Sequence, residues 1–310
     1  MSAVPSSQRT ALGVLLACSA VTVFTLMSAF VKAADRIPAG ETMFFRSALA
    51  LPVVLAWLFA TGGLKGGIAT TNYRGHAARG IAGSLAMGLG FAGLKYLPLP
   101  EVTAIRFVTP VFLVVLAALM LGERLRLVRI SAVLVGLVGV VIITAPRFSA
   151  GLGSNAALGA LLTLGSASLA ALAQVFVKSM SGRETTAAIV FYFSLTAATL
   201  SLLTIPFGWV MPFGIEWVWL AGAGLVGGIG QILLTASYRH ADAGVLAPFT
   251  YISMLWSIVI GYFWFGEVPT LPMLGGAGLI ILAGVAIVLR ERQLGLRTTA
   301  ERQVAAKTMR

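Results

Sequence analysis

Residues 101–123 read EVTAIRFVTPVFLVVLAALMLGE, an apolar run of the length that a helix needs to cross a bilayer. The interior of this run carries one full charge, Arg106, and one helix breaker, Pro110. The run closes on a glycine followed by Glu123.

The same layout returns about 144 residues later in residues 245–267, which read VLAPFTYISMLWSIVIGYFWFGE. This copy also contains an internal proline, Pro248, and closes on Gly266 and Glu267. A segment of this kind that occurs twice predicts a chain built from two related halves.

The composition indicates that lipid is the solvent of this chain. Hydrophobic residues make up 58% of it and charged residues only 10%, a balance that would leave a water-soluble domain with a largely apolar surface. The net charge of +12 lies in short runs between apolar stretches and in the C-terminal tail. That placement is typical of membrane topology signals and argues against a nucleic-acid partner. The single cysteine, Cys18, excludes an intrachain disulfide.

Ten apolar segments are long enough to span the membrane, which predicts an all-α integral membrane protein. The expected spans are residues 11–33, 40–60, 79–96, 101–121, 128–145, 157–178, 185–206, 215–238, 243–265 and 271–289. The loops between them are too short for a water-soluble domain. Residues 11–13 (ALG) recur as 157–159 and residues 30–32 (FVK) recur as 176–178, so the first span has a counterpart and is expected to be retained.

Lysines and arginines set the expected orientation. With a cytoplasmic N-terminus, nine of them lie in cytoplasmic loops and four in the opposite loops, the bias that inner-membrane proteins show. The sequence therefore predicts a bacterial-type inner membrane protein with both termini in the cytoplasm. Five is an odd number, so two halves of five helices each must be inverted relative to one another. Inverted repeats are typical of secondary transporters.

The chain also resembles the EamA-type branch of the drug/metabolite transporter superfamily. The residues that carry the resemblance are the Phe45-Arg46 pair, the two five-span halves and the two Gly-Glu endings. It implies two inverted five-helix repeats, residues 1–146 and 152–290, with a basic cytoplasmic tail at 291–310. It also implies a central cavity formed mainly by the first, third, fourth, sixth, eighth and ninth helices.

Two basic residues, Arg46 and Arg106, lie well inside the expected spans, at least five residues from either end. A charge within the bilayer is costly and normally faces a cavity or a partner. Arg106 could bind an anionic group of a solute. Alternatively, it snorkels to the interface or pairs with Glu101 or Glu41. Arg46 is expected to support the scaffold.

The carboxylates and prolines of the spans are expected to have structural or gating roles. Glu123 and Glu267 end helices, where the helix dipole disfavours a negative charge, so each predicts a basic or backbone partner. With them we group Glu41, Glu101, Pro110 and Pro248.

Uncharged polar residues in the spans are candidates for the cavity lining, although a helix–helix hydrogen bond is an alternative role for each. They are Thr103, Thr109, Gln174, Gln231, Thr250, Tyr251, Ser253 and Trp256.

The function expected from this pattern is alternating-access transport of a small organic metabolite, such as an amino acid or another anionic or zwitterionic solute. The alternative is an integral membrane enzyme acting on a lipid or lipid-linked substrate. That alternative needs clustered acids, histidines or nucleophiles, and the two histidines, His76 and His240, lie far apart in the sequence. No catalytic residue, metal or cofactor is predicted. The expected partners are the solute and the lipid bilayer, and the architecture is compatible with a monomer.

Overall fold

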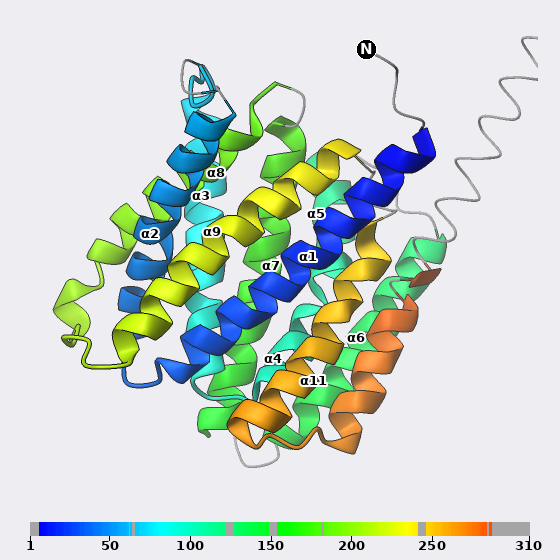
Figure 1. The fold of residues 1–310 in the computed structure, drawn as a ribbon. Helices are drawn as coiled ribbons and strands as arrows, with labels where there is room; N and C mark the ends of the chain where they lie inside the picture. Colours follow the sequence, from blue (N-terminus) through cyan, green and yellow to red (C-terminus); the bar gives the residue numbers. More distant parts are fainter. Residues whose placement is uncertain are drawn as a thin grey trace, which may run out of the picture.

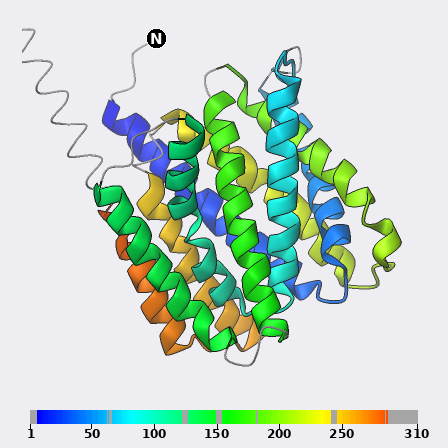
Figure 2. The same ribbon diagram turned by 180° about the vertical axis from the view of Figure 1, so that it is seen from behind.

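The computed structural model describes residues 6–61, 63, 66–121, 127–148, 154–180, 183–240, 246–283 and 285–286. These residues form a bundle of helices that run up and down between two ends (Figure 1, Figure 2). The first half comprises α1 (Ser6–Ala33), α2 (Ala39–Ala60), α3 (Tyr73–Leu94), α4 (Leu99–Arg106), α5 (Thr109–Leu121) and α6 (Leu127–Phe148). The second half comprises α7 (Asn155–Met180), α8 (Thr186–Leu202), η1 (Ile205–Phe207), α9 (Glu216–His240), η2 (Ala247–Tyr251), α11 (Ile252–Phe265) and a last helix, Leu271–Ala283.

The expected all-α membrane fold is confirmed. Five helices are individually long and apolar enough to span a bilayer, and shorter apolar helices complete the remaining crossings. With α4 and α5 counted as one crossing, and η2 and α11 as another, the described helices make five crossings before α7 and five from α7 onward. The start of α1 therefore lies at the same end of the bundle as the end of the last helix.

The third crossing begins earlier than the sequence predicts. Its expected start was residue 79, but α3 begins at Tyr73. The side chain of Asn72 caps the helix by accepting a hydrogen bond of 3.0 Å from the backbone N–H of Gly75. The extra six residues move Arg79 from the edge of the span into the helix interior.

The fourth and ninth crossings are each interrupted, at corresponding positions. The fourth crossing breaks at Phe107 and Val108, between α4 and α5. In the ninth crossing, the short 3₁₀ helix η2 precedes α11. Proline explains the first break: Pro110 has no N–H to donate to the carbonyl of Arg106 four residues earlier, and its ring would collide with that carbonyl. Pro110 instead occupies the first turn of α5, where no such donor is required.

The packing of the helices repeats between the halves. The contact of α1 with α9 corresponds to the contact of α7 with α3, because α1 and α7 open the two halves and α3 and α9 are their third crossings. At the two interruptions, Phe107 and Tyr251 are 144 residues apart, and their rings meet edge to face with centroids 5.1 Å apart. Equivalent residues that touch must lie beside the axis that relates the halves. An axis of this kind lies in the membrane plane, so both interruptions lie near mid-membrane.

Close glycine contacts join α6 to the last helix. A Cβ atom at Gly276 would lie 2.5 Å from the carbonyl oxygen of Gly139, and a Cβ atom at Gly139 would lie 2.7 Å from the carbonyl oxygen of Gly276. Each helix therefore approaches the other through a position without a side chain.

Gly276→Ala is expected to lower the melting temperature, because the new methyl group meets backbone atoms that cannot move aside. Overpacking of this kind costs about 1–3 kcal/mol. Gly275→Ala is the matched control, since nothing lies within 4 Å of its Cβ position. Thermal melting in detergent compares the two variants. Equal melting temperatures would contradict the proposed close packing.

Candidate functional site

One face of α4 is the most distinctive feature of the bundle interior. Six of its residues are buried, which leaves Thr103 and Arg106 as the residues of α4 with accessible side chains. They are three positions apart and therefore share one face of the helix. Helices α1, α3, α6, α7 and α11 all contact α4, and in Figure 1 it lies between α7 and α11. A helix so enclosed has no broad face toward lipid, which makes its polar accessible face a candidate for contact with a solute.

The break after α4 sets the position of Arg106. Its carbonyl, which Pro110 leaves without a backbone donor, accepts a hydrogen bond of 2.6 Å from the hydroxyl of Thr109. The Arg106 side chain is exposed between buried neighbours. Within the described part of the chain, its guanidinium has no hydrogen-bond or ion-pair partner. None of the five N–H donors of the guanidinium thus has an acceptor among the described residues.

The second interruption brings further predicted residues toward the same depth. Tyr251 is half-buried and packs on Phe107, the residue after Arg106. Ser253 lies two residues on and donates a 2.7 Å hydrogen bond to the carbonyl of Thr250. The interrupted segments thus bring Arg106 and Tyr251 to neighbouring positions at mid-membrane.

The other candidates for the cavity lining are more dispersed. Gln174 is exposed on α7, a helix that contacts both α4 and α5. Gln231 is half-buried on α9. Trp256 is exposed on α11 beside Leu255 and near Val259, a surface typical of lipid contact.

A compact polar cluster closes one end of the bundle, the end where α1 finishes, which we call the Lys32 end. The ammonium of Lys32 forms an ion pair of 2.8 Å with Glu267 and donates hydrogen bonds to the carbonyls of Leu97 (2.8 Å) and Leu94 (3.3 Å). The other carboxylate oxygen of Glu267 accepts from the backbone N–H of Leu99 at 2.8 Å. Gly266, with φ of +65°, ends α11 in the left-handed conformation and aims Glu267 back into the bundle.

This cluster joins three segments that are far apart in the sequence. Lys32 ends α1, Leu94 and Leu97 flank the turn from α3 to α4, and Glu267 follows α11. The partner expected for Glu267 is therefore present, both as a basic side chain and as a backbone donor. We call this cluster the Lys32–Glu267 lock.

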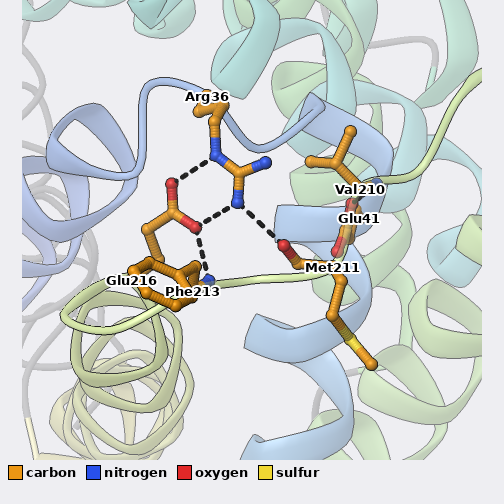
Figure 3. Close-up of polar contacts among 6 residues, drawn as sticks. All are labelled: Arg36, Glu41, Val210, Met211, Phe213 and Glu216. Atoms are coloured by element: carbon orange, nitrogen blue, oxygen red, sulfur yellow. Dashed lines mark hydrogen bonds and ion pairs between the residues drawn. The ribbon is translucent and has the colours of Figure 1, made fainter.

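A second set of contacts at the Lys32 end fastens α9 to the loop between α1 and α2 (Figure 3). The guanidinium of Arg36 donates to both carboxylate oxygens of Glu216, at 2.8 and 2.5 Å, and to the carbonyl of Met211 at 2.8 Å. The hydrogen bond with Glu216 raises the pKa of Arg36. Glu41 is buried and accepts a 2.9 Å hydrogen bond from the N–H of Val210. Glu41 thus bonds to backbone in this structure.

Lys95 adds to the closure of this end. Its ammonium donates hydrogen bonds to the carbonyls of Asp35 and Ile37, which joins the end of α3 to the loop before α2. Burial lowers the pKa of Lys95. Together, these contacts hold the ends of α1, α3, α9 and α11 against neighbouring segments at the Lys32 end.

Several expected residues lie outside the described part of the chain or are only partly described. Glu123 and the glycine before it are outside it, as is the tail at 291–310. Pro248 lies within η2. Glu101 is buried near the start of α4. Among the described residues, no group of three His, Cys, Asp or Glu side chains could hold a metal ion.

Sequence reasoning missed two functional candidates, Lys32 and Arg79. Lys32 was counted as a loop residue, although the repetition of residues 30–32 at 176–178 marked it as part of the duplicated framework. Arg79 was placed at the edge of the third span, yet its side chain is buried in α3. The capping residue Asn72 is the signal that would have extended this helix.

Comparison with known proteins agrees with this architecture. The model of the EamA-like transporter family matches residues 11–145 and 157–290. The pseudopaline exporter CntI of Pseudomonas aeruginosa is 33% identical over 282 residues, which cover 89% of this chain and 95% of the exporter. The riboflavin transporter of Vibrio cholerae is 27% identical over 297 residues, with 95% and 97% of the two chains covered.

Two further similarities extend the comparison. The S-adenosylmethionine uptake transporter of Rickettsia felis is 28% identical over 258 residues, which cover 83% of this chain and 85% of that protein. A solved crystal structure superposes with a TM-score of 0.65 over 93% of this chain and 99% of the other, at 22% identity, and supports the fold alone. The expectation drawn from the repeats and the Gly-Glu endings is therefore confirmed, and this chain belongs to the EamA-like transporter family.

Proposed function

We propose that this protein is a secondary transporter that moves a small organic metabolite across the bacterial inner membrane by alternating access. The similar proteins are named for different metabolites, and one is named as an exporter and another as an uptake transporter. Their names therefore support the class of activity and leave the solute to the chemistry of the site.

The observation that carries the proposal is the accessible guanidinium of Arg106, which has no partner among the described residues, at an interrupted helix near mid-membrane. Discontinuous helices at equivalent positions of two inverted repeats are the usual place of a transporter's binding site. A planar guanidinium pairs well with a carboxylate or a similar anionic group. The favoured solute is thus anionic or zwitterionic, with an amino acid as one example. The predicted residues that we place beside it are Thr103, on the same face of α4, and Tyr251, which packs on Phe107.

The Lys32–Glu267 lock supports a closed outer side in the described state. In our proposed topology both termini, and the tail at 291–310, are cytoplasmic, so the Lys32 end faces outward. The lock joins helices of the first unit (1–146) to one of the second (152–290). Alternating access requires it to open when the outer side opens.

An integral membrane enzyme is the competing function, and a channel is another. Proteoliposomes loaded with unlabelled solute and supplied with labelled amino acids and other small carboxylates distinguish them. We expect labelled solute to accumulate transiently by counterflow, at a rate that saturates with concentration. Flux that never saturates would indicate a channel, and lipid turnover without solute flux would indicate an enzyme. Either result would overturn the proposal.

A further inference from the structure

Two arginines that have no acidic partner among the described residues meet inside the bundle, on other helices than Arg106. Arg46 of α2 is 3% exposed and Arg79 of α3 is 8% exposed. Both guanidinium groups face the ring of Phe193 on α8, with their central carbons 4.2 Å (Arg79) and 5.5 Å (Arg46) from its centroid. The two positive charges therefore lie within about 10 Å of each other.

This cluster lies deep in the membrane. Arg46 is the eighth residue of α2 and Phe193 is the eighth residue of α8, the equivalent helix of the second half. Since α2 and α8 pack together, the contact between Arg46 and Phe193 lies beside the axis that relates the halves. That axis lies in the membrane plane, where an uncompensated charge is most costly.

The hydrogen-bond donors of this cluster are unsatisfied. Within the described chain, Nε and Nη1 of both arginines are buried and lack a hydrogen-bond partner. The buried hydroxyls of Ser47, Ser84 and Ser194, on the same three helices, also lack one. The ring of Phe193 makes a favourable cation–π contact with each guanidinium. It carries no negative charge that could neutralise them. Buried charges are normally paired, and leaving two like charges unpaired is strongly unfavourable.

The neighbouring carboxylate that could pair with Arg79 is engaged elsewhere. Glu184 lies 3.2 Å from the imidazole of His76, one turn before Arg79, and accepts a 2.9 Å hydrogen bond from Thr70. The backbone nevertheless makes room for both arginines. A Cβ atom at Gly83 would lie 2.0 Å from Nη1 of Arg79, and one at Gly227 would lie 3.1 Å from Nε of Arg46. The described part of the chain thus accommodates two buried cations without supplying an anion.

We propose that Arg46 and Arg79 together bind a small inorganic anion of halide size between α2, α3 and α8. The unpaired nitrogens are out of contact with solvent, so the anion must be compact and shed its water. Chloride satisfies both conditions, and the weakly hydrated guanidinium groups suit an anion that is easily dehydrated. The anion would neutralise part of the buried charge and hold the three helices together. This site is separate from Arg106 and requires no transported solute.

The test is the melting temperature of the full-length protein in detergent, with chloride replaced by bulky gluconate at constant ionic strength and with no transport substrate present. We expect the wild-type melting temperature to rise by about 2 °C or more as chloride increases from zero to 150 mM, as for any ligand that binds the folded state. Arg79→Met removes one charge while keeping the length of the side chain. We expect it to lose the response to chloride and to melt at or above the wild-type temperature in gluconate.

Four controls assign the response to this site. Arg183→Gln, at an exposed position, and Arg106→Ala should both keep the full chloride response. Equilibrium dialysis of the wild-type protein against radioactive chloride should retain about one chloride per chain, and this readout stands even if Arg79→Met fails to fold. Acetate should stabilise less than chloride.

Four results would overturn the proposal. They are equal melting in chloride and gluconate with no bound chloride, an unchanged response in Arg79→Met, loss of the response in Arg106→Ala, and stabilisation by acetate in preference to chloride. None of these measurements involves transport. Failure of the chloride proposal would therefore not contradict the proposed transport activity.

Discussion

Replacing Arg106 with alanine is expected to lower transport of an anionic solute by about 10- to 100-fold at low solute concentration, since a hydrogen bond to a charged group contributes about 1.5–3 kcal/mol. The guanidinium lies at the break between α4 and α5 on an accessible face, and no described residue pairs with it. In the proposed role, its loss removes a contact to the solute rather than a contact to another described residue. Initial rates of uptake into proteoliposomes measure the effect.

The melting temperature separates this role from a structural one. If Arg106 binds solute, Arg106→Ala melts within about 2 °C of wild type, a shift of roughly 1 kcal/mol or less. If the arginine instead supports the helix bundle, the variant loses stability. Arg106→Lys keeps the charge but not the planar fork, and an intermediate rate is expected. Full transport in Arg106→Ala would remove the arginine from the binding site.

Breaking the Lys32–Glu267 lock is the second large effect that we expect. Lys32→Met leaves Glu267 without its cation, and Glu267→Gln leaves Lys32 with only carbonyl partners. The side chains are 16% and 14% exposed, so each single change should cost about 1–3 kcal/mol, less than for a fully buried pair. The double variant, which contains no unpaired charge, should be more stable than the sum of the single changes predicts.

A matched pair at the same end of the bundle is the control for this cycle. Arg36 and Glu216 also form an ion pair, but the side chain of Arg36 is 51% exposed. Arg36→Gln and Glu216→Gln should therefore have small effects. Thermal melting of both sets of variants gives the coupling within each pair. Additive effects at Lys32 and Glu267 would show that the lock contributes no coupling between the halves.

The duplicated segments at 101–123 and 245–267 predicted much of the fold. Their length, their prolines and their Gly-Glu endings are local features, so the sequence displays them directly. The position of the first break could also have been derived, because Pro110 frees the carbonyl of the residue four positions before it, and that residue is Arg106. The structure added the hydroxyl of Thr109, which bonds to that carbonyl.

Long-range pairings could not be predicted in the same way. Lys32 and Glu267 are 235 residues apart in the chain, and their contact depends on how α1 and α11 converge at one end of the bundle. The burial of Arg79 was not predicted, because α3 begins six residues before residue 79, the expected start of this span. The partner of Glu41 is the backbone of Val210, and backbone partners have no signature in the sequence.

The most direct test of alternating access around Arg106 is the accessibility of Thr103, its companion on α4. Cys18 is the only cysteine in the chain, so Thr103→Cys in a Cys18→Ser background gives one reactive thiol. A membrane-impermeant maleimide is applied to oriented vesicles from either face. With the lock intact, we predict fast labelling from the cytoplasmic face and slow labelling from the outer face. Adding Lys32→Met and Glu267→Gln should speed outer labelling about tenfold, as a shift of roughly 1.4 kcal/mol between the two states requires. Fast labelling from the outer face with the lock intact, and no change when the lock is removed, would contradict this account.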